Sequence, residues 1–310
     1  MKWEAGMPLP DVTQLNKRFG AAGRIAFRAG SGGLPVAALA GPHGACEVSL
    51  YGAQVLGYKP LGHAPVLFVS RKAVYEAGKP IRGGIPVCWP WFGAHPNEKG
   101  KPGHGFARLL TWSLLTAEYS AQVTDIKLGL SDSEQTRPFW PHAFDLTLRV
   151  VLDTTLRVEL TTRNRDKAPI AISEALHTYL LVRDVAHASV IGLDGVRYYD
   201  DLTGQEHAAQ KGAVLIRGET DRVYHDTNPE CSVDDAGLGR QIVVAKRNSH
   251  STVVWNPWIE KSKRMADFGD DEYLRMLCVE TANTRQAALT LPPGEVHTMA
   301  LSLRAELKTA

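Results

Sequence analysis

The chain has 310 residues, of which 44% are hydrophobic, so it is long enough to bury a core of its own. Its 35 basic and 33 acidic side chains leave a formal net charge of +2, with no long basic run and no charged tail. This balance argues against a nucleic-acid partner or a membrane partner, so any anion must bind through a local group of cations.

The cellular compartment is predicted from the cysteines and the apolar segments. Cys46, Cys88, Cys231 and Cys278 are widely scattered, without a CxxC pair or the His/Cys spacing of a zinc site, which favours reduced, buried thiols. The first twenty residues lack the apolar core of a signal peptide, and no uncharged run reaches transmembrane length. We therefore expect a cytoplasmic protein.

Taken in chain order, the predicted elements are mostly strands. A short helix is expected from Asp11, and apolar residues then alternate with polar ones over 146–152 and 156–160, which predicts a hairpin with one buried face. A second short helix is expected over 261–269. After the turn at 292–294, we expect a closing strand whose buried side carries Met299, Leu301, Leu303 and Leu307.

The overall pattern predicts an all-β protein. The 28 glycines and 18 prolines punctuate short alternating segments, which is typical of packed antiparallel sheets rather than of repeated βαβ units. With no internal repeat and no change in composition that would mark a linker, we expect one domain over residues 1–310. The Gly/Pro-rich stretch at 94–103 is expected to be a loop at the site.

The segment from 79 to 108, KPIRGGIPVCWPWFGAHPNEKGKPGHGFAR, is the most informative part of the chain. It contains Trp89, Trp91 and Phe92 between two Gly/Pro turns that carry Arg82 and Arg108. An arginine fork matches two phosphate oxygens, and aromatic faces cover the apolar C–H faces of a sugar ring, so a phosphorylated sugar is the first hypothesis. The alternative is a surface loop whose arginines pair with acids and whose aromatic residues fill the core.

Four sequence blocks, in order, carry a family resemblance. They are KPIRGGIPVCWPWFG with HGFAR, SEALHTYLLVRDV at 173–185, ETDRVY at 219–224 and VVWNPWIEKSKRMADFGDDEYLRMLCVETAN at 253–283. They resemble the D-hexose-6-phosphate mutarotases, also called glucose-6-phosphate 1-epimerases, a branch of the aldose 1-epimerase (galactose mutarotase-like) family. The resemblance runs from about Tyr51 to the C-terminus and implies a large antiparallel β-sandwich with few short helices.

The reaction that the resemblance implies needs only an acid and a base. Exchange of α and β anomers requires loss of the O1 proton and protonation of the ring oxygen O5, followed by rotation and closure on the other face of the aldehyde. A carboxylate near O1 and a histidine near O5 suit these two roles. No metal, nucleophile or organic cofactor is required.

The resemblance implies that His177 is the catalytic acid and Glu280 the catalytic base. From the residues alone, His177 fits a hydrogen-bonded core histidine equally well, and Glu280, which follows the apolar run 276–279, fits a solvated strand end or a group aimed into a cleft. Glu174 precedes His177 but belongs to the opposite side of a strand, which favours a structural hydrogen bond.

Four further residues are predicted to bind substrate. The resemblance assigns Arg82 and Arg108 to the 6-phosphate, with glycine neighbours that allow close approach of the backbone to the ligand. It places His104 at sugar hydroxyls or the ring oxygen, with turn stabilisation as the alternative. Asp221 resembles an aspartate that holds two hydroxyl groups, and the plain alternative is pairing with Arg222.

Some features depart from the family pattern or stay outside the predicted site. Gly103 stands where some relatives carry a polar side chain, so one substrate contact is in doubt. The aromatic cluster at 255–258 is interpreted as core plus turn. The basic group Lys261, Lys263 and Arg264 is interpreted as a solvated face that would at most enrich phosphate locally.

The sequence therefore predicts a cytoplasmic, monomeric isomerase that interconverts the anomers of glucose-6-phosphate and related aldohexose 6-phosphates. Its partner would be a small-molecule sugar phosphate, with no cofactor. Two alternatives stay open: a mutarotase of unphosphorylated aldoses, and a non-catalytic carbohydrate-binding protein on the same fold.

Overall fold

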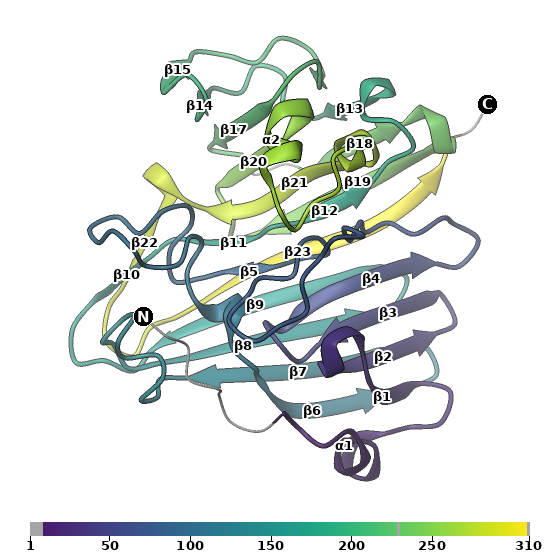
Figure 1. Ribbon diagram of the computed structural model, residues 1–310, viewed down its shortest axis with the longest axis vertical. Helices are drawn as coiled ribbons and strands as arrows, with labels where there is room; N and C mark the ends of the chain where they lie inside the picture. The colour runs from purple at the N-terminus through teal and green to yellow at the C-terminus, as the bar shows by residue number, and fades with distance from the viewer. Residues whose placement is uncertain (1–8, 228–229, 309–310) are drawn as a thin grey trace.

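The computed structural model describes residues 9–227 and 230–308 (Figure 1). The predicted domain over 1–310 also includes residues 1–8, 228–229 and 309–310, which lie outside the described residues. In the described part, antiparallel strands dominate and the only α-helices are α1 (Val12–Phe19) and α2 (Trp258–Arg264), so the all-β prediction is confirmed. None of the helices among the described residues has the length and apolar character needed to cross a membrane.

The largest sheet, here called the back sheet, contains the predicted hairpin and the predicted closing strand. Its strands are, in spatial order, β16 (Val214–Leu215), β13 (Ala188–Ile191), β18 (Cys231–Asp235), β19 (Arg240–Arg247), β23 (Val296–Leu307), β9 (Leu156–Asn164), β8 (Phe144–Leu152), β7 (Thr124–Ser131) and β6 (Ser113–Tyr119). The hairpin β8–β9 is confirmed. Met299, Leu301 and Leu303 of β23 are buried as predicted, but Leu307 is 68% exposed because it lies at the end of the strand.

The second large sheet, here called the site sheet, brings together segments that are far apart in the sequence. Its strands are, in spatial order, β15 (Gln205–His207), β14 (Tyr198–Asp200), β17 (Thr220–His225), β20 (Ser251–Asn256), β21 (Met276–Asn283), β11 (Glu174–Leu176) and β5 (Val87–Cys88), and β12 (Tyr179–Leu181) also pairs with β21. The smaller sheets are formed by β1 (Ile25–Ala29), β2 (Pro35–Gly41), β3 (Gly44–Ser49) and β4 (Gln54–Pro60), and by β10 (Ile170–Ile172) and β22 (Leu289–Leu291).

The main hydrophobic core lies between the back sheet and the layer formed by the site sheet and β1–β4. Isolated bridges join Val55 of β4 to Ile85, just before β5, and Leu180 of β12 to Leu67, which follows β4 in the chain. Because successive side chains of a strand point to opposite faces, the site sheet sends alternate residues into this core, such as Leu277 and Val279 of β21. The intervening residues of β21 therefore lie on the outer face of the sheet.

The two α-helices lie near the predicted positions. In α1, the Asp11 side chain accepts a hydrogen bond from the Thr13 amide at 2.8 Å, as an N-cap residue does, and the helix packs beside β1 (Figure 1). The second helix begins at Trp258, earlier than the predicted start at Lys261, because Pro257 provides its N-terminal cap position. Trp258 itself packs against Tyr273.

A buried ion pair connects the back sheet to the rest of the core. The Arg240 Nε lies 3.3 Å from Asp235, and both side chains are only 1% exposed. The remaining guanidinium nitrogens donate to the carbonyl oxygens of Ala64, Pro65 and Leu181 at 2.7–3.0 Å. The guanidinium therefore stabilises three carbonyls outside the back sheet as well as one carboxylate.

We expect Arg240→Ala to lower the free energy of unfolding by about 3–5 kcal/mol, because it leaves the Asp235 carboxylate buried without its partner. Urea unfolding followed by circular dichroism measures this loss. Arg304→Ala is the matched control, since Arg304 forms ion pairs in the same sheet but is 37% exposed, and its loss should cost about 1 kcal/mol or less. Equal losses for the two variants would contradict this assignment.

Candidate active site

The glycines of the RGG motif are required by packing between strands. A Cβ atom on Gly83 would lie 2.4 Å from the Val69 Cα, and one on Gly84 would lie 2.1 Å from the Val55 carbonyl oxygen. Both residues also have positive φ angles, of 118° and 64°. These glycines therefore let the segment that carries Arg82 pack closely against the neighbouring chain, and their predicted close approach to a ligand stays a prediction.

Of the three aromatic residues singled out in the segment 79–108, one lies in the main core and two lie at the site. Trp89 is fully buried, with its ring against Phe106, Trp140 and Phe144, and its Nε1 donates to Thr162 at 3.0 Å. Trp89, which directly follows β5, therefore packs into the main core and does not line the cavity. Trp91 and Phe92 do line the cavity described next.

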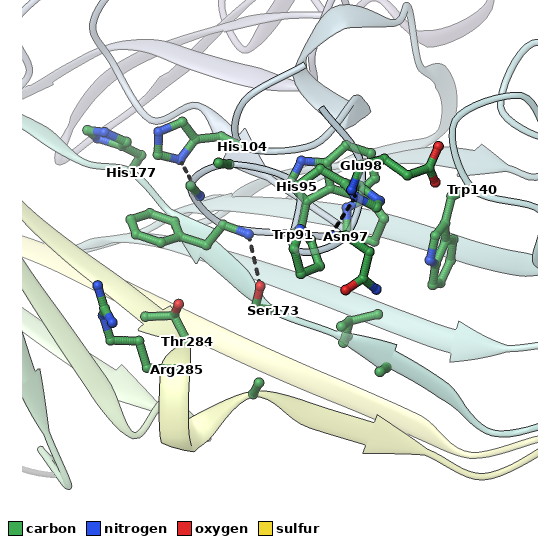
Figure 2. A pocket seen from close by; sticks show the side chains of 18 of the residues that line it. Trp91, His95, Asn97, Glu98, His104, Trp140, Ser173, His177, Thr284 and Arg285 are labelled. Carbon is green, nitrogen blue, oxygen red and sulfur yellow. Dashed lines mark hydrogen bonds between the residues drawn. The ribbon is translucent and has the colours of Figure 1, made fainter. Parts of the chain in front are cut away.

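A cavity of about 1040 Å³ opens over the outer face of the site sheet. In Figure 2, His104 and His177 lie next to each other at one end, and Trp91, His95 and Trp140 lie towards the other end. The cavity brings together most of the predicted site residues, with Arg108 outside the set that lines it. The predicted residues that line it are Arg82, His104, His177, Asp221 and Glu280.

His177 lies at a break in the predicted strand. The alternating pattern of SEALHTYL, residues 173–180, is strand-like in the sequence, but β11 ends at Leu176 and β12 begins at Tyr179. The His177 amide donates to the Pro86 carbonyl at 3.0 Å, and its ring stacks on Tyr179 with 4.8 Å between centroids and 10° between planes. The break and the stacked ring hold the imidazole against the floor of the cavity.

Glu280 lies in the middle of β21 and not at its end, which corrects the prediction from the apolar run 276–279. It pairs with Val253 of β20 and is only 1% exposed. Its Oε1 is 3.4 Å from the His177 Nδ1. Neither this Nδ1 nor the Glu280 Oε2 makes a hydrogen bond to any described residue. The two side chains are thus close, buried and incompletely satisfied.

The electrostatic environment favours the uncharged forms of both groups. Burial raises the pKa of Glu280 well above its usual value, and the negative Asp221 adds to this effect. Burial also lowers the pKa of His177 well below its usual value, with further contributions from His104, Arg108 and Arg82. In this uncharged form the pair has one titratable proton, the carboxyl proton of Glu280, in addition to the N–H that a neutral imidazole keeps. Transfer of that proton from Glu280 to His177 gives the carboxylate and the imidazolium.

His104 stabilises a turn, as one of its two predicted roles requires, and it also lines the cavity where the predicted substrate contact would lie. Its Nδ1 accepts a hydrogen bond from the Gly93 amide at 3.3 Å, which stabilises the turn, while its ring lies edge-on to His177 with 5.6 Å between centroids. Burial lowers the pKa of His104 to about 3, so the ring is neutral near pH 7. The following Gly105 is required because a Cβ would lie 1.9 Å from the Trp89 carbonyl oxygen.

The two predicted phosphate-binding arginines differ in their partners. Arg82 forms an ion pair with Asp267 at 3.0 Å and donates to the Tyr179 hydroxyl at 3.1 Å. Arg108 donates to the Gly103 carbonyl at 2.8 Å, and its Nε is buried without a hydrogen bond to the described residues. Only Arg82 lines the cavity, although the charge of each contributes to the low pKa of His177.

Asp221 has a different cationic neighbour from the one considered in the sequence. Its Oδ2 lies 3.8 Å from the Lys261 Nζ, whereas Arg222 is 3.5 Å from Asp200. The alternative of pairing with Arg222 is therefore wrong, because adjacent strand residues point to opposite faces. Burial raises the pKa of Asp221 to about 6 despite the lysine.

Sequence reasoning missed several lining residues. Trp255 belongs to a buried hydrophobic cluster, as its interpretation as core predicts, but it also lines the cavity and lies edge-on to His177. Lys261, also a lining residue, has its Nζ 5.7 Å from the Trp255 ring centre. Arg285 lines the cavity with a positive φ of 56° and a guanidinium 3.7 Å over Tyr199. Strand alternation relates Trp255 to Asp221, its partner in β17, but gives no signal for Lys261 or Arg285.

The contacts of Glu174 and Gly103, two residues near the site, bear on what the sequence predicted for them. Glu174 is fully buried and accepts a hydrogen bond from the Asn283 Nδ2 at 3.0 Å, with His297 3.1 Å away, so it has the structural role predicted for it. A Cβ on Gly103 would meet only the Gly93 carbonyl oxygen, at 3.8 Å, so a side chain fits there without displacing the backbone.

Comparison with known proteins assigns the chain to a family. The family model described as aldose 1-epimerase matches residues 36–304. A protein from Cenchrus ciliaris named "putative glucose-6-phosphate 1-epimerase" is 38% identical over 274 residues, which cover 85% of this chain and 82% of that protein. A protein of the same name from Escherichia coli (strain K12) is 37% identical over 266 residues, covering 85% and 87%.

Solved structures agree with this assignment. The crystal structure of a "putative mutarotase" from Salmonella typhimurium has a TM-score of 0.86 and 32% identity, covering 92% of this chain and 94% of that one. A galactose mutarotase-like protein from Clostridium acetobutylicum has a TM-score of 0.71 at 14% identity, which shows the same fold. The chain belongs to the aldose 1-epimerase family. It is accordingly an enzyme of the isomerase class with the galactose mutarotase-like sandwich fold.

The raised pKa of Asp221 predicts a pH-dependent effect of one substitution. A carboxyl group with a folded-state pKa of about 6 contributes stability that is fully present below its ordinary value of 3.8 and is lost as the pH rises through about 6. We therefore expect Asp221→Asn to stabilise the protein above pH 6 and to leave it unchanged near pH 3.5.

Urea midpoints of Asp221→Asn and the parent chain, measured across this pH range, test the prediction. Asp226→Asn is the control, because that side chain is 79% exposed. A midpoint difference between Asp221→Asn and the parent that stays constant with pH would show that Asp221 is not destabilised by burial.

Proposed function

We propose that this protein interconverts the α and β anomers of aldohexose 6-phosphates, with glucose-6-phosphate among its substrates. The observation that carries the proposal is the buried His177–Glu280 pair, which faces a cavity that also contains cationic side chains. The names of the curated relatives, which identify them as putative glucose-6-phosphate 1-epimerases, support the same substrate class.

The proposed chemistry uses the single proton of the pair. Glu280, as a carboxylate, takes the O1 proton of the sugar while His177, as an imidazolium, gives a proton to O5, and the ring opens. After rotation about C1–C2, the same groups work in reverse and the ring closes as the other anomer. The 3.4 Å separation of their nearest atoms lets one proton distribution change into the other without a large movement.

The phosphate of the substrate would change the charges around His177. We assign the 6-phosphate to Arg82 and Arg108, whose positive charges contribute to the low pKa of His177. A bound phosphate offsets those charges and so raises the proton affinity of His177. Substrate binding thereby favours the imidazolium–carboxylate form, in which both groups are ready for the reaction.

Two more residues complete the proposed substrate site. Asp221 lines the cavity opposite Trp255 in the sheet register, where its carboxylate can accept hydrogen bonds from sugar hydroxyls. His104, neutral and edge-on to His177, is assigned to a hydroxyl or to the ring oxygen. The cavity volume of about 1040 Å³ leaves ample space for a hexose phosphate.

The alternatives fit these observations less well. A mutarotase of free aldoses has no need for the pair of arginines behind the acid, and a pure binding protein has no need for a buried acid and base without hydrogen-bond partners. The four cysteines, all buried free thiols in the described part of the chain, support a reducing compartment such as the cytoplasm. A monomer in that compartment is part of the proposal.

The proposal is tested by magnetisation transfer between the α and β H1 signals of glucose-6-phosphate, with glucose measured under identical conditions. We expect the protein to accelerate exchange strongly for the phosphate and scarcely for the free sugar, because only the phosphate offsets the arginine charges. Faster exchange of glucose alone would support a mutarotase of free aldoses. Binding of the phosphate without faster exchange would indicate a non-catalytic protein.

Substitutions separate the roles within the site. Glu280→Gln and His177→Ala should each lower kcat by about 10²–10⁴-fold while substrate still binds, because each removes one member of the acid/base pair. Arg82→Ala should instead raise KM by roughly tenfold to a hundredfold, the value of a charge-assisted hydrogen bond, with less effect on kcat.

Arg82→Lys keeps the positive charge and should restore part of the affinity. Arg137→Ala is the matched arginine control, since that side chain is 60% exposed in an ion pair with Asp132. Loss of substrate binding in Glu280→Gln, or an unchanged KM in Arg82→Ala, would contradict the assigned roles.

A further inference from the structure

Cys278 is a buried thiol that the proposed reaction does not use, and it lies beside both members of the acid/base pair. It occupies the position two residues before Glu280 on the same face of β21, and it pairs with Tyr179 of β12, on which the His177 ring stacks. One donor atom each from His177, Cys278 and Glu280 lies within 4.8 Å of the others.

We propose that His177, Cys278 and Glu280 form a binding site for a thiophilic divalent cation such as Zn²⁺, and that an ion bound there blocks the acid/base pair. An imidazole nitrogen, a thiolate and a carboxylate oxygen are the ligand types that zinc takes, and three protein ligands leave its fourth position to a water molecule. The sequence showed no zinc spacing because only Cys278 and Glu280 share a strand, β21, whereas His177 comes from the distant break between β11 and β12, which meets β21 only in the folded sheet.

The donors are available for coordination. The His177 Nδ1 and the Glu280 Oε2 are buried and make no hydrogen bond to the described residues, so a cation would displace no existing partner of these atoms. Zinc bonds of about 2.0–2.3 Å place tetrahedral donor atoms about 3.5 Å apart, so donors within 4.8 Å need to move together by about 1 Å. Both residues line the cavity, which gives the ion a path from solvent.

Charge neutrality favours a divalent ion at this position. Coordination replaces the proton on the Cys278 sulfur and the proton shared by the Glu280–His177 pair, and both protons go to solvent. A thiolate and a carboxylate then balance the two positive charges of the metal, with the imidazole neutral. A neutral complex suits a buried site that already has Arg82 and Arg108 nearby, and the thiolate selects Zn²⁺ over Mg²⁺.

The binding part of this inference is independent of the activity, and its inhibitory consequence rests on the proposed function. A metal held by Glu280 and His177 takes the lone pairs that would accept and relay the sugar protons. Sugar phosphate and metal should therefore compete, with the cation acting as an inhibitor of anomer exchange and not as a cofactor.

Co²⁺ added to the metal-free protein tests binding directly, because a cysteine thiolate bound to cobalt gives a charge-transfer absorption band. We expect this band in the parent chain, its loss on addition of Zn²⁺, and its loss in Cys278→Ser. Cys88→Ser is the matched control, since Cys88 is an equally buried thiol on the outer face of the same sheet but outside the donor group, and it should keep the band.

The inhibitory consequence is measured on glucose-6-phosphate exchange by NMR. Zn²⁺ should inhibit the parent chain and Cys88→Ser, Mg²⁺ should not, and Cys278→Ser should keep its basal exchange. The Zn²⁺ concentration for half-inhibition should rise in Cys278→Ser by about 100-fold or more, because Cys278 is a direct ligand and loss of even an outer-sphere partner costs about 10- to 100-fold in metal affinity. Cys278→Ala replaces the serine variant if circular dichroism shows that the latter is unfolded.

The outcomes separate the two proposals. A cobalt–thiolate band that depends on Cys278 in a protein without mutarotase activity would support the site and sink the proposed function. Absence of the band in the parent chain, or equal loss of it in the Cys88 and Cys278 variants, would overturn the site. Zn²⁺ inhibition that is unchanged in the Cys278 variant would do the same.

Discussion

Burial of both faces of β21 is the constraint on which the rest of the structure depends. Every residue of this strand, from Met276 to Asn283, is buried, although only alternate side chains enter the main core. The outer face needs a second cover, and it is supplied by aromatic side chains from other segments, among them Phe68, Trp255 and Phe268. Because that cover is incomplete above Glu280, the outer face becomes the floor of a cavity.

The same constraint sets the chemistry of the site. Around Glu280 the outer face of the site sheet carries a cluster of buried side chains, Cys88, Ala175, Val253 and Ala282, which supply no hydrogen bond to the carboxylate. A carboxyl group in such surroundings prefers to keep its proton, and a histidine prefers to lose one. The fold therefore buries the Glu280 carboxyl group and the His177 imidazole without a full set of hydrogen-bond partners. This arrangement costs stability and leaves both groups free to exchange protons.

The sequence predicts the features that depend on local periodicity. It does not predict the features that depend on which other segments pack over a strand. The alternation at 146–160 correctly predicts the hairpin β8–β9, and the short helix expected from Asp11 is found as α1, because neighbours in the chain determine both. Alternation does not say what covers the outer face of a strand. For that reason the sequence left Glu280 open between a solvated strand end and a group aimed into a cleft, and interpreted Lys261 as part of a solvated face, while Arg285 gave no signal.

The family resemblance predicted more of the site than periodicity did, because it implies which distant segments of the chain lie close together. It placed Arg82, His104, Asp221 and Glu280 in one site before any fold was known, and these residues do line one cavity with His177. The resemblance did not give the neighbouring side chains that position these residues and shift their pKa values. The link from Asp267 through Arg82 to the Tyr179 ring under His177 depends on three separate segments, whose proximity only the tertiary structure provides.

In the proposed reaction, this link would give the 6-phosphate, which we assign to Arg82 and Arg108, a role in the chemical step as well as in binding. Arg82 is held between Asp267 and Tyr179, so its positive charge is fixed near the imidazole whether or not substrate is present. In the free protein that charge opposes protonation of His177. A substrate phosphate reverses the balance, since it adds negative charge at the same place. A sugar without phosphate would meet a histidine with no proton to give, so selectivity would arise from the protonation state of the acid even where both sugars fit the cavity.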